Sequence, residues 1–247
     1  MTKIDTSTPL TDASAMPVGA HIEELRKRIL VALLALVVTT IVSFAFAEKG
    51  IEYLAIPVGG VDNLISLEVT ENVGVYMRVA LLSGFILALP VMLYQILAFV
   101  LPGLKPAEKR SLLLAIPAAV LLFASGVLFA YFVMLPAALP FLISFITVKT
   151  TLRLSSYFEF VTGLLFWIGL SFEMPLVVYV LARFGLVKAS HLLRGWRYAL
   201  VIIAILAAVI TPTPDPVNMG LLMVPLFLLY LLSILFAHMA RPSKNPE

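Results

Sequence analysis

The segment Gly169-Leu170-Ser171-Phe172-Glu173-Met174-Pro175 lies inside an apolar stretch that runs from about residue 158 to 182. Such a stretch is long enough to cross a bilayer. A carboxylate at that depth costs roughly 2.5 to 3.5 kcal/mol, so it is usually retained for function and turned away from lipid. Pro175 lacks an amide hydrogen and leaves the carbonyl of Ser171 without a helical donor. We therefore predict a membrane helix with a polar interruption formed by Ser171, Glu173 and Pro175. A neutral Glu173 with a purely structural hydrogen bond is the alternative.

The composition extends this interpretation to the whole chain. Hydrophobic residues make up 62% of the 247 residues and charged residues 13%, against about 45 to 50% and 25% in soluble domains. We therefore expect an all-α polytopic membrane protein. Six apolar segments are long enough to be candidate spans, at about residues 29–47, 73–101, 111–135, 158–182, 198–211 and 217–238. Prolines 90, 117, 175 and 225 each interrupt one of them, which favours bent helices around a concave body.

An even number of spans places both termini on the same side of the membrane. The first span follows a basic flank, residues 26–28, and no cleavage-type site of small residues comes after it, so we expect an uncleaved anchor with a cytoplasmic amino terminus. The whole chain, residues 1–247, is expected to form one membrane domain, with polar cytoplasmic tails at 1–20 and 239–247.

The connecting segments support six spans. Most positive charges fall on the predicted cytoplasmic side, whereas the opposite side is mainly acidic. The cytoplasmic group is Lys105, Lys109, Arg110, Arg183, Lys188, Arg194, Arg197, Arg241 and Lys244, and the opposite group is Glu48, Glu52, Asp62, Glu68, Glu71 and Asp215 with Lys49, Lys149 and Arg153.

Two features depart from simple spans. The fifth segment has about 14 residues and reaches only about 21 Å, against a hydrocarbon core of about 30 Å. The segments 48–70 and 134–157 on the acidic side are too long for turns and too apolar for free loops. We expect them to pack over that end of the molecule as a lid.

The chain offers few residues for chemistry. It has no cysteine, and its three histidines are far apart. Its sequence lacks a phosphate-binding glycine loop, a His-Glu-x-x-His pair and a Gly-x-Ser-x-Gly elbow. We therefore expect no enzyme activity, catalytic residue, metal site or cofactor, and no nucleic-acid partner.

Two acidic residues stand out on the basic cytoplasmic side. Glu24 precedes the first span, and Glu108 precedes the third. Carboxylates in a partly dehydrated interface bind guanidinium groups well. A local interpretation stays open: Glu24 is four residues from Arg28 on a helix, and Glu108 lies near a helix amino terminus, where a negative charge is favoured.

Several motifs together resemble the TatC family of the twin-arginine protein translocase. His21-Ile22-Glu23-Glu24-Leu25-Arg26-Lys27-Arg28 is similar to the family's amino-terminal signature. Further motifs follow in the family's order, at residues 90–95, 99 with 102–104 and 108–110, 129–132, 171–175 and 211–216.

The resemblance implies a receptor for Arg-Arg signal peptides of folded cargo, which works with single-span TatA- and TatB-type subunits and is driven by the proton-motive force. It implies a bacterial or archaeal cytoplasmic membrane, and we expect self-association. By the same resemblance, Glu24 and Glu108 receive the arginine pair, with Arg26, Phe99 and Lys109 nearby. Glu173 lines the concave membrane face where the signal peptide and partner helices dock, while Pro57, Tyr131 and Asp215 belong to the outer lid and the functional patch linked to it.

Two other functions remain as alternatives. One is a proton-coupled secondary transporter that uses Glu173 as its proton carrier. Such carriers usually contain several intramembrane ionisable groups, whereas we expect only one in this chain. The other is a passive scaffold for membrane subunits, which would not discriminate between peptides.

Overall fold

The computed structural model describes residues 18–100, 106–144, 152–211 and 216–240, and they are almost entirely helical. Within these residues, five helical segments are long and apolar enough to cross a membrane: Ile22–Phe44, Glu71–Phe99, Ala115–Pro140, Leu154–Arg183 and Met219–Met239. A sixth, shorter apolar helix covers Trp196–Ile210. The prediction of an all-α protein with six membrane spans is confirmed.

The spans follow the predicted order. They are built from α1 (Val18–Phe44), α3 (Glu71–Val100), α4 (Pro106–Phe129) continued by η4 (Ala130–Met134) and α5 (Leu135–Ser144), α6 (Leu154–Phe172) with α7 (Met174–Arg183), α9 (Trp196–Ile210) and α10 (Pro216–Met239). The segment η4 is a π-helix inside the third span. Pro90, Pro117 and Pro225 lie within continuous helices.

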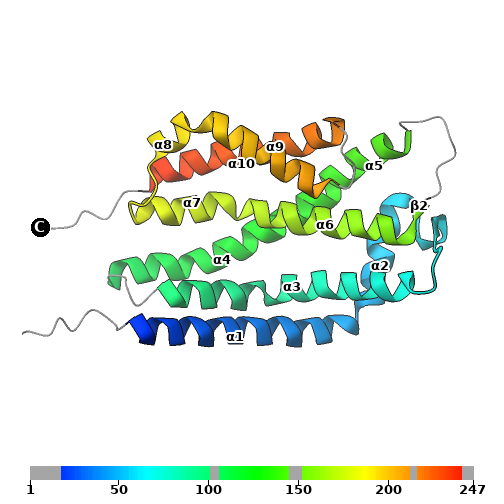
Figure 1. Cartoon of the computed structure of the whole chain (residues 1–247), viewed down its shortest axis with the longest axis horizontal. Helices are drawn as coiled ribbons and strands as arrows, with labels where there is room; N and C mark the ends of the chain where they lie inside the picture. Colours follow the sequence, from blue (N-terminus) through cyan, green and yellow to red (C-terminus); the bar gives the residue numbers. More distant parts are fainter. Residues whose placement is uncertain (1–17, 101–105, 145–151, 212–215, 241–247) are drawn as a thin grey trace, which may run out of the picture.

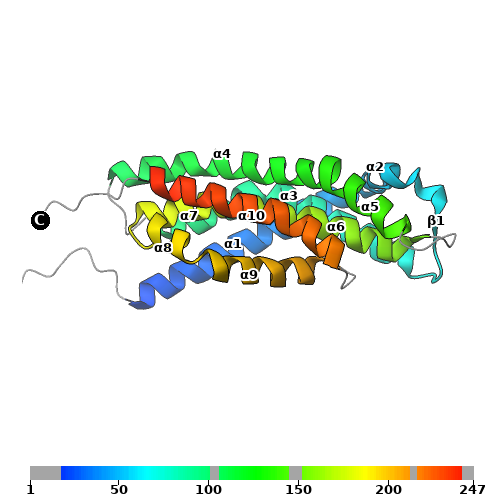
Figure 2. The same cartoon turned by 90° about the horizontal axis from the view of Figure 1, so that it is seen from above.

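The helices run side by side along the long axis of the molecule (Figures 1 and 2). Helices α1 and α3 lie on one side, α6 and α7 lie in the middle, and α8 (Ala189–Arg194), α9 and α10 lie on the other, with α4 crossing α6. The first described helix begins, and α10 ends, at the same end of the bundle (Figure 1). This arrangement agrees with an even number of crossings.

Charge separates the two ends. One, the basic end, carries Arg26, Lys27, Arg28, Arg183, Lys188, Arg194 and Arg197. The other, the lid end, carries α2 (Ala47–Ala55), η1 (Ile56–Val58), η2 (Val61–Asn63), and the two-residue strands β1 (Leu64–Ile65) and β2 (Leu152–Arg153), which pair in parallel. The predicted lid is therefore confirmed for its first segment, at the end that was expected to be acidic. The second predicted segment, 134–157, is wrong as a separate lid element, because α5 continues the third span and α6 begins at Leu154; residues 145–151 lie outside the described residues.

The helix break at Glu173 has the predicted cause. Helix α6 ends at Phe172, and α7 begins at Met174 with Pro175 in its first turn. Pro175 has no amide hydrogen to donate, and the next described bond across the junction runs from the amide of Val177 to the carbonyl of Glu173, at 3.0 Å. Glu173 therefore lies at a discontinuity between two helices of one span.

The α4–α6 crossing depends on two glycines. A Cβ added at Gly126 would lie 3.0 Å from the Cα of Gly169 and 2.8 to 2.9 Å from the Cγ and Cβ atoms of Phe172. A Cβ at Gly169 would lie 2.9 Å from the ring of Phe123, which is 1% exposed. The helices therefore approach each other as closely as small residues allow.

We expect Gly126→Ala to destabilise the protein by about 1 to 3 kcal/mol, because the added methyl group forces α4 and α6 apart in a packed core. Thermal unfolding of the detergent-solubilised protein measures this effect. Gly163→Ala in α6 is the matched control, since nothing lies within 4 Å of a Cβ there. Equal unfolding temperatures for the two variants would contradict the close approach.

The short α9 also agrees with the sequence. Its 15 residues reach about 22 Å at 1.5 Å per residue, less than the roughly 30 Å hydrocarbon core. Tyr198 at its start is 77% exposed, and Arg197 packs against the ring of Trp196, 5.8 Å from its centroid. These side chains form an interfacial anchor at the basic end.

Candidate functional site

The basic end holds a small polar network between α1 and α3. Arg28 Nη2 lies 3.2 Å from Glu24 Oε1, and Arg28 Nη1 donates to Gln95 Oε1 at 3.1 Å. The Glu24 side chain is 21% exposed and the Arg28 side chain 31%. The local interpretation of Glu24 and Arg28 as an i, i+4 pair is therefore confirmed, and Gln95 ties this pair to the next span.

Among the described residues, Glu24 pairs with Arg28 through one of its two carboxylate oxygens. A carboxylate has about four acceptor positions on two oxygens, and the described contact with Arg28 uses Oε1. The Glu24 side chain is only 21% exposed, on a helix whose other surface positions are mostly exposed apolar residues. The pair is therefore less hydrated than one on an open surface, a setting in which charge-assisted hydrogen bonds are stronger.

The other residues expected at this site are only partly described. Arg26 is exposed on α1, and Phe99 is half-buried near the end of α3. Glu108 and Lys109 belong to the first turns of α4, and their side chains lie outside the described residues. Whether the two glutamates face each other stays a prediction.

The Glu173 side chain is buried within the helix bundle. It is 7% exposed and turned towards α4, where its carboxyl group lies against the backbone of Phe123. Its Oε1 atom is buried without a hydrogen-bond partner in the described part of the chain. Ser171, by contrast, lines a cavity on the open side of the bundle. The Glu173 carboxyl group therefore lies in the interface with α4, and a role of Ser171, Glu173 and Pro175 in partner docking stays a prediction.

Tyrosine hydroxyls hold the lid onto the bundle. Tyr131, from the π-helix η4, donates to the carbonyl of Tyr53 at 2.8 Å and stacks on its ring at 4.9 Å between centroids. Tyr157 donates to the carbonyl of Leu54 at 2.6 Å. Pro57 lies in the next turn, η1. Tyr131 thus contacts the lid from the third span, and Pro57 lies within the lid, while Asp215 lies outside the described residues.

We expect Tyr157→Phe to loosen the lid, because the buried carbonyl of Leu54 loses a hydrogen bond worth about 1 to 2 kcal/mol. Amide hydrogen exchange in residues 47–60 should become faster while exchange in the spans stays unchanged. Tyr198→Phe is the control, since that side chain is exposed. Unchanged exchange in the lid would contradict this anchoring.

An ion pair joins the lid to the bundle. Arg153, the second residue of β2, donates to Glu71 at the start of α3 and to Glu68 at 2.8 Å. These hydrogen bonds, first that to Glu71, raise the pKa of the Arg153 guanidinium. Both partners were predicted on this side of the membrane, but their contact was not.

Sequence reasoning missed two charged residues inside the spans. Arg78 of α3 and Glu159 of α6 form an ion pair of 3.3 Å, and both lie within candidate membrane spans. The count of one intramembrane ionisable group was therefore wrong. In the sequence each residue is a single charge in an apolar run, and its ion-pair partner lies 81 residues away. The presence of a charge in a span was therefore the only signal that either residue is functional.

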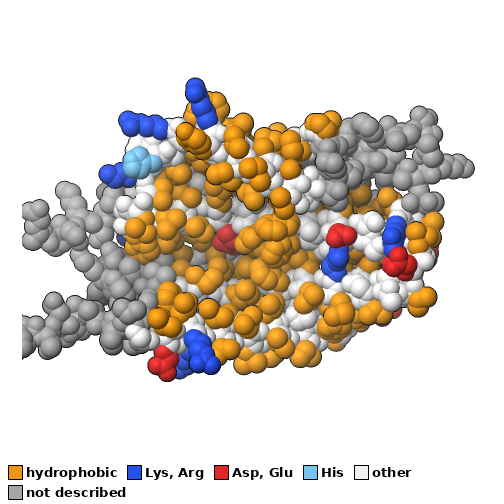
Figure 3. All heavy atoms as spheres, viewed as in Figure 1, with side chains coloured by type: hydrophobic (Ala, Val, Ile, Leu, Met, Phe, Trp, Pro, Cys, Tyr) orange, Lys and Arg blue, Asp and Glu red, His pale blue; other side chains and the backbone are white. Residues whose placement is uncertain are grey.

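Two cavities lie along the bundle, each of about 530 Å³. The first is bordered by α1, α3, α6 and α9 and contains the Arg78–Glu159 pair. The second is bordered by α6 to α10 and is almost entirely apolar. They adjoin at Trp167 and Ile210, which line both. Figure 3 shows that hydrophobic side chains dominate this face between its charged ends. No cluster of three metal-ligating residues occurs among the described residues.

Comparison with known proteins agrees with the motifs and the fold. The family described as Sec-independent protein translocase protein (TatC) matches residues 20–225. A TatC protein of Carboxydothermus hydrogenoformans is 35% identical over 232 residues, covering 93% of this chain and 96% of the relative. One of Deinococcus radiodurans is 38% identical over 239 residues, covering 93% and 88%.

A solved structure is equally similar. The crystal structure of a twin-arginine translocase receptor, TatC, superposes with a TM-score of 0.80 at 35% identity, covering 89% of this chain and 99% of that one. Sequence and fold agree over nearly the full length of these relatives. This chain belongs to the TatC family of Sec-independent protein translocase proteins.

Proposed function

We propose that this chain is the signal-peptide receptor and core membrane subunit of a twin-arginine protein translocase. Family membership and the similarity to a twin-arginine translocase receptor support this function. Because these matches are to protein translocase subunits, they favour a receptor over the proton-coupled transporter. The family consists of protein translocase subunits and not of known enzymes, so it gives no support for an enzyme activity.

The observation that carries the proposal is the half-buried carboxylate of Glu24 at the basic end, already paired with one guanidinium. In our proposal the arginine pair of a signal peptide binds there, with Glu108 as the second carboxylate. Arg26, Phe99 and Lys109 border the same surface. Because the surroundings are cationic, the two carboxylates are the attractive positions for a basic peptide, and neighbouring lysines and arginines repel a peptide in any other register.

The orientation, the partner subunits, the role of the lid and the energy source in this proposal follow from assigning the chain to a twin-arginine translocase. The basic end faces the cytoplasm of a bacterial or archaeal cell, as the distribution of positive charge indicates. Single-span TatA- and TatB-type subunits associate with the spans, near Ser171, Glu173 and Pro175, and further copies of this chain complete the complex. The lid, with Pro57, Tyr131 and Asp215, covers the outer end. The proton-motive force supplies the energy.

A binding experiment with the purified full chain tests the proposal. A labelled signal peptide with an Arg-Arg motif should bind at least about tenfold more tightly than the same peptide with Lys-Lys, because a lysine ammonium lacks the planar pair of donors that matches a carboxylate. A passive scaffold predicts no difference. Equal affinities for the two peptides would overturn the receptor proposal.

A further inference from the structure

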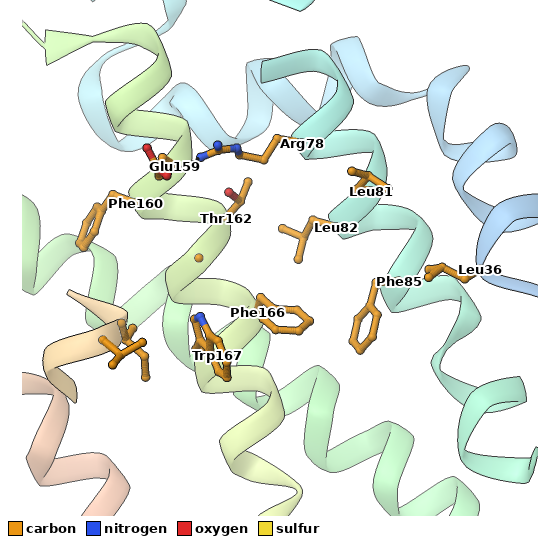
Figure 4. Close-up of a pocket in the computed structure, with 13 residues that line it drawn as sticks. Leu36, Arg78, Leu81, Leu82, Phe85, Glu159, Phe160, Thr162, Phe166 and Trp167 are labelled. Carbon is orange, nitrogen blue, oxygen red and sulfur yellow. Dashed lines mark ion pairs between the residues drawn. The ribbon is translucent and has the colours of Figure 1, made fainter. Parts of the chain in front are cut away.

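The first cavity, which contains the Arg78–Glu159 pair, is charged at one end and apolar at the other along the direction that crosses the membrane. Figure 4 shows Arg78 and Glu159 pointing towards each other from α3 and α6, with Phe85 and Phe166 farther along the same helices. The rings of Phe85 and Phe166 meet edge to face, with centroids 5.0 Å apart. The cavity therefore has a charged mouth and an aromatic floor.

The charged mouth lies near the boundary between the headgroups and the hydrocarbon core. Arg78 is seven residues after the start of α3 and Glu159 five after the start of α6, or about 10 and 8 Å from the lid end at 1.5 Å per residue. Helix α3, with 30 residues, spans about 45 Å, the thickness of a bilayer with its headgroups. Phe166 and Trp167 lie about 10 Å deeper than Glu159, among the acyl chains.

The ion pair keeps free binding capacity. The Arg78 side chain is 44% exposed and that of Glu159 is 65% exposed. A guanidinium has five N–H donors and a carboxylate about four acceptor positions, whereas the described contact joins Nη1 to Oε1 alone. At the boundary with hydrocarbon, water supplies these groups poorly, so a ligand with opposite charges in the same spacing is favoured.

We propose that this cavity binds a phospholipid of the lid-side leaflet whose headgroup carries both a phosphate and a primary ammonium, namely phosphatidylethanolamine. The phosphate accepts hydrogen bonds from Arg78, and the ammonium donates to Glu159. One acyl chain follows Leu82 and Phe85 to Phe166 and Trp167, all of which line the cavity. The order of charged and apolar groups in the cavity matches that of such a lipid.

The same chemistry predicts selectivity. A choline headgroup has no N–H to donate, so it gains from Arg78 and not from hydrogen bonding to Glu159. A glycerol headgroup can donate hydroxyl hydrogen bonds to Glu159, but it has no cation to balance the phosphate, so the lipid stays anionic beside the Glu159 carboxylate. We therefore expect an apparent affinity about tenfold higher for the ethanolamine lipid than for either alternative.

Tryptophan quenching in vesicles measures this preference. The chain has two tryptophans, so Trp196→Phe leaves Trp167 as the reporter inside the cavity. The full-length variant is reconstituted in vesicles of mixed lipids, in which only the ethanolamine, the choline or the glycerol lipid carries brominated acyl chains at equal mole fraction. We expect the strongest quenching with the brominated ethanolamine lipid.

Two further variants locate the site. Glu159→Gln should equalise quenching by the ethanolamine and choline lipids, and Arg78→Gln should weaken quenching by both. Glu48→Gln is the matched control, because that side chain is exposed on α2 and does not line the cavity. Equal quenching by the three lipids in the unmodified cavity would overturn the proposal, as would an ethanolamine preference that survives Glu159→Gln. Stronger quenching by the glycerol lipid would overturn it in favour of a simple anionic-lipid site.

Discussion

Gly84→Val is expected to destabilise the protein by about 3 kcal/mol and to abolish signal-peptide binding. A Cβ at residue 84 would lie 2.6 Å from the Cα and 2.8 Å from the amide nitrogen of Thr40 in α1. Both are backbone atoms, so no side-chain rotation relieves the clash, and the two helices must separate. The hydrogen bond of 2.8 Å from the Thr39 hydroxyl to the carbonyl of Gly84 is lost at the same time.

The effect is large because α1 depends on this contact. Helix α1 packs mainly against α3. Only 6% of its apolar membrane-spanning stretch is buried inside the protein. The link from Arg28 to Gln95 joins the same two helices at the basic end. If α1 moves away from α3, Glu24 moves with it, so stability and binding fail together.

Thermal unfolding and peptide binding of the purified protein measure both effects. Gly74→Val, near the start of α3, is the matched control, since nothing lies within 4 Å of a Cβ built at residue 74. It carries the same loss of glycine and the same added volume. If Gly84→Val unfolds at the temperature of Gly74→Val, the α1–α3 contact does not have the importance that we give it.

Glu24→Gln is expected to weaken binding of an Arg-Arg peptide about 30-fold, or about 2 kcal/mol, because one partner of a partly dehydrated charge pair is removed. Its effect on folding should be small. The contact that it breaks within the chain is an i, i+4 pair with Arg28, and such pairs contribute about 0.3 to 0.5 kcal/mol. Binding and stability therefore respond to this change by clearly different amounts.

Isothermal titration with a signal peptide and thermal unfolding separate the two quantities. Glu23→Gln is the control: it removes the same charge from the neighbouring residue, which is exposed on α1. General loss of negative charge at the basic end would weaken binding equally in both variants. Such an equal loss would contradict a specific role for Glu24.

The sequence predicted the fold because local patterns determine most of it. Apolar length located the six spans, and the missing donor of Pro175 located the break beside Glu173. The spacing of Glu24 and Arg28 on one helix face suggested their ion pair, which the structure contains. In each case the cause and its effect lie within a few residues of one another.

What the sequence did not reveal depends on contacts between distant helices. Arg78 and Glu159 meet only after α3 and α6 are placed side by side. The direction of Glu173 follows from the close crossing of α4 and α6 at their glycines, which brings Phe123 beside its carboxyl group. Helical periodicity within one span carries no information about which neighbour a buried face will meet.

A double-mutant cycle between Glu24 and the peptide arginines tests the central claim most directly. Affinities are measured for wild type and Glu24→Gln, each with the Arg-Arg peptide and with a peptide in which one arginine is replaced by glutamine. If Glu24 binds that arginine, the two changes interact by about 1.5 kcal/mol or more for one of the two peptide positions. Additive losses at both positions, within about 0.5 kcal/mol, would show that the arginine pair binds elsewhere.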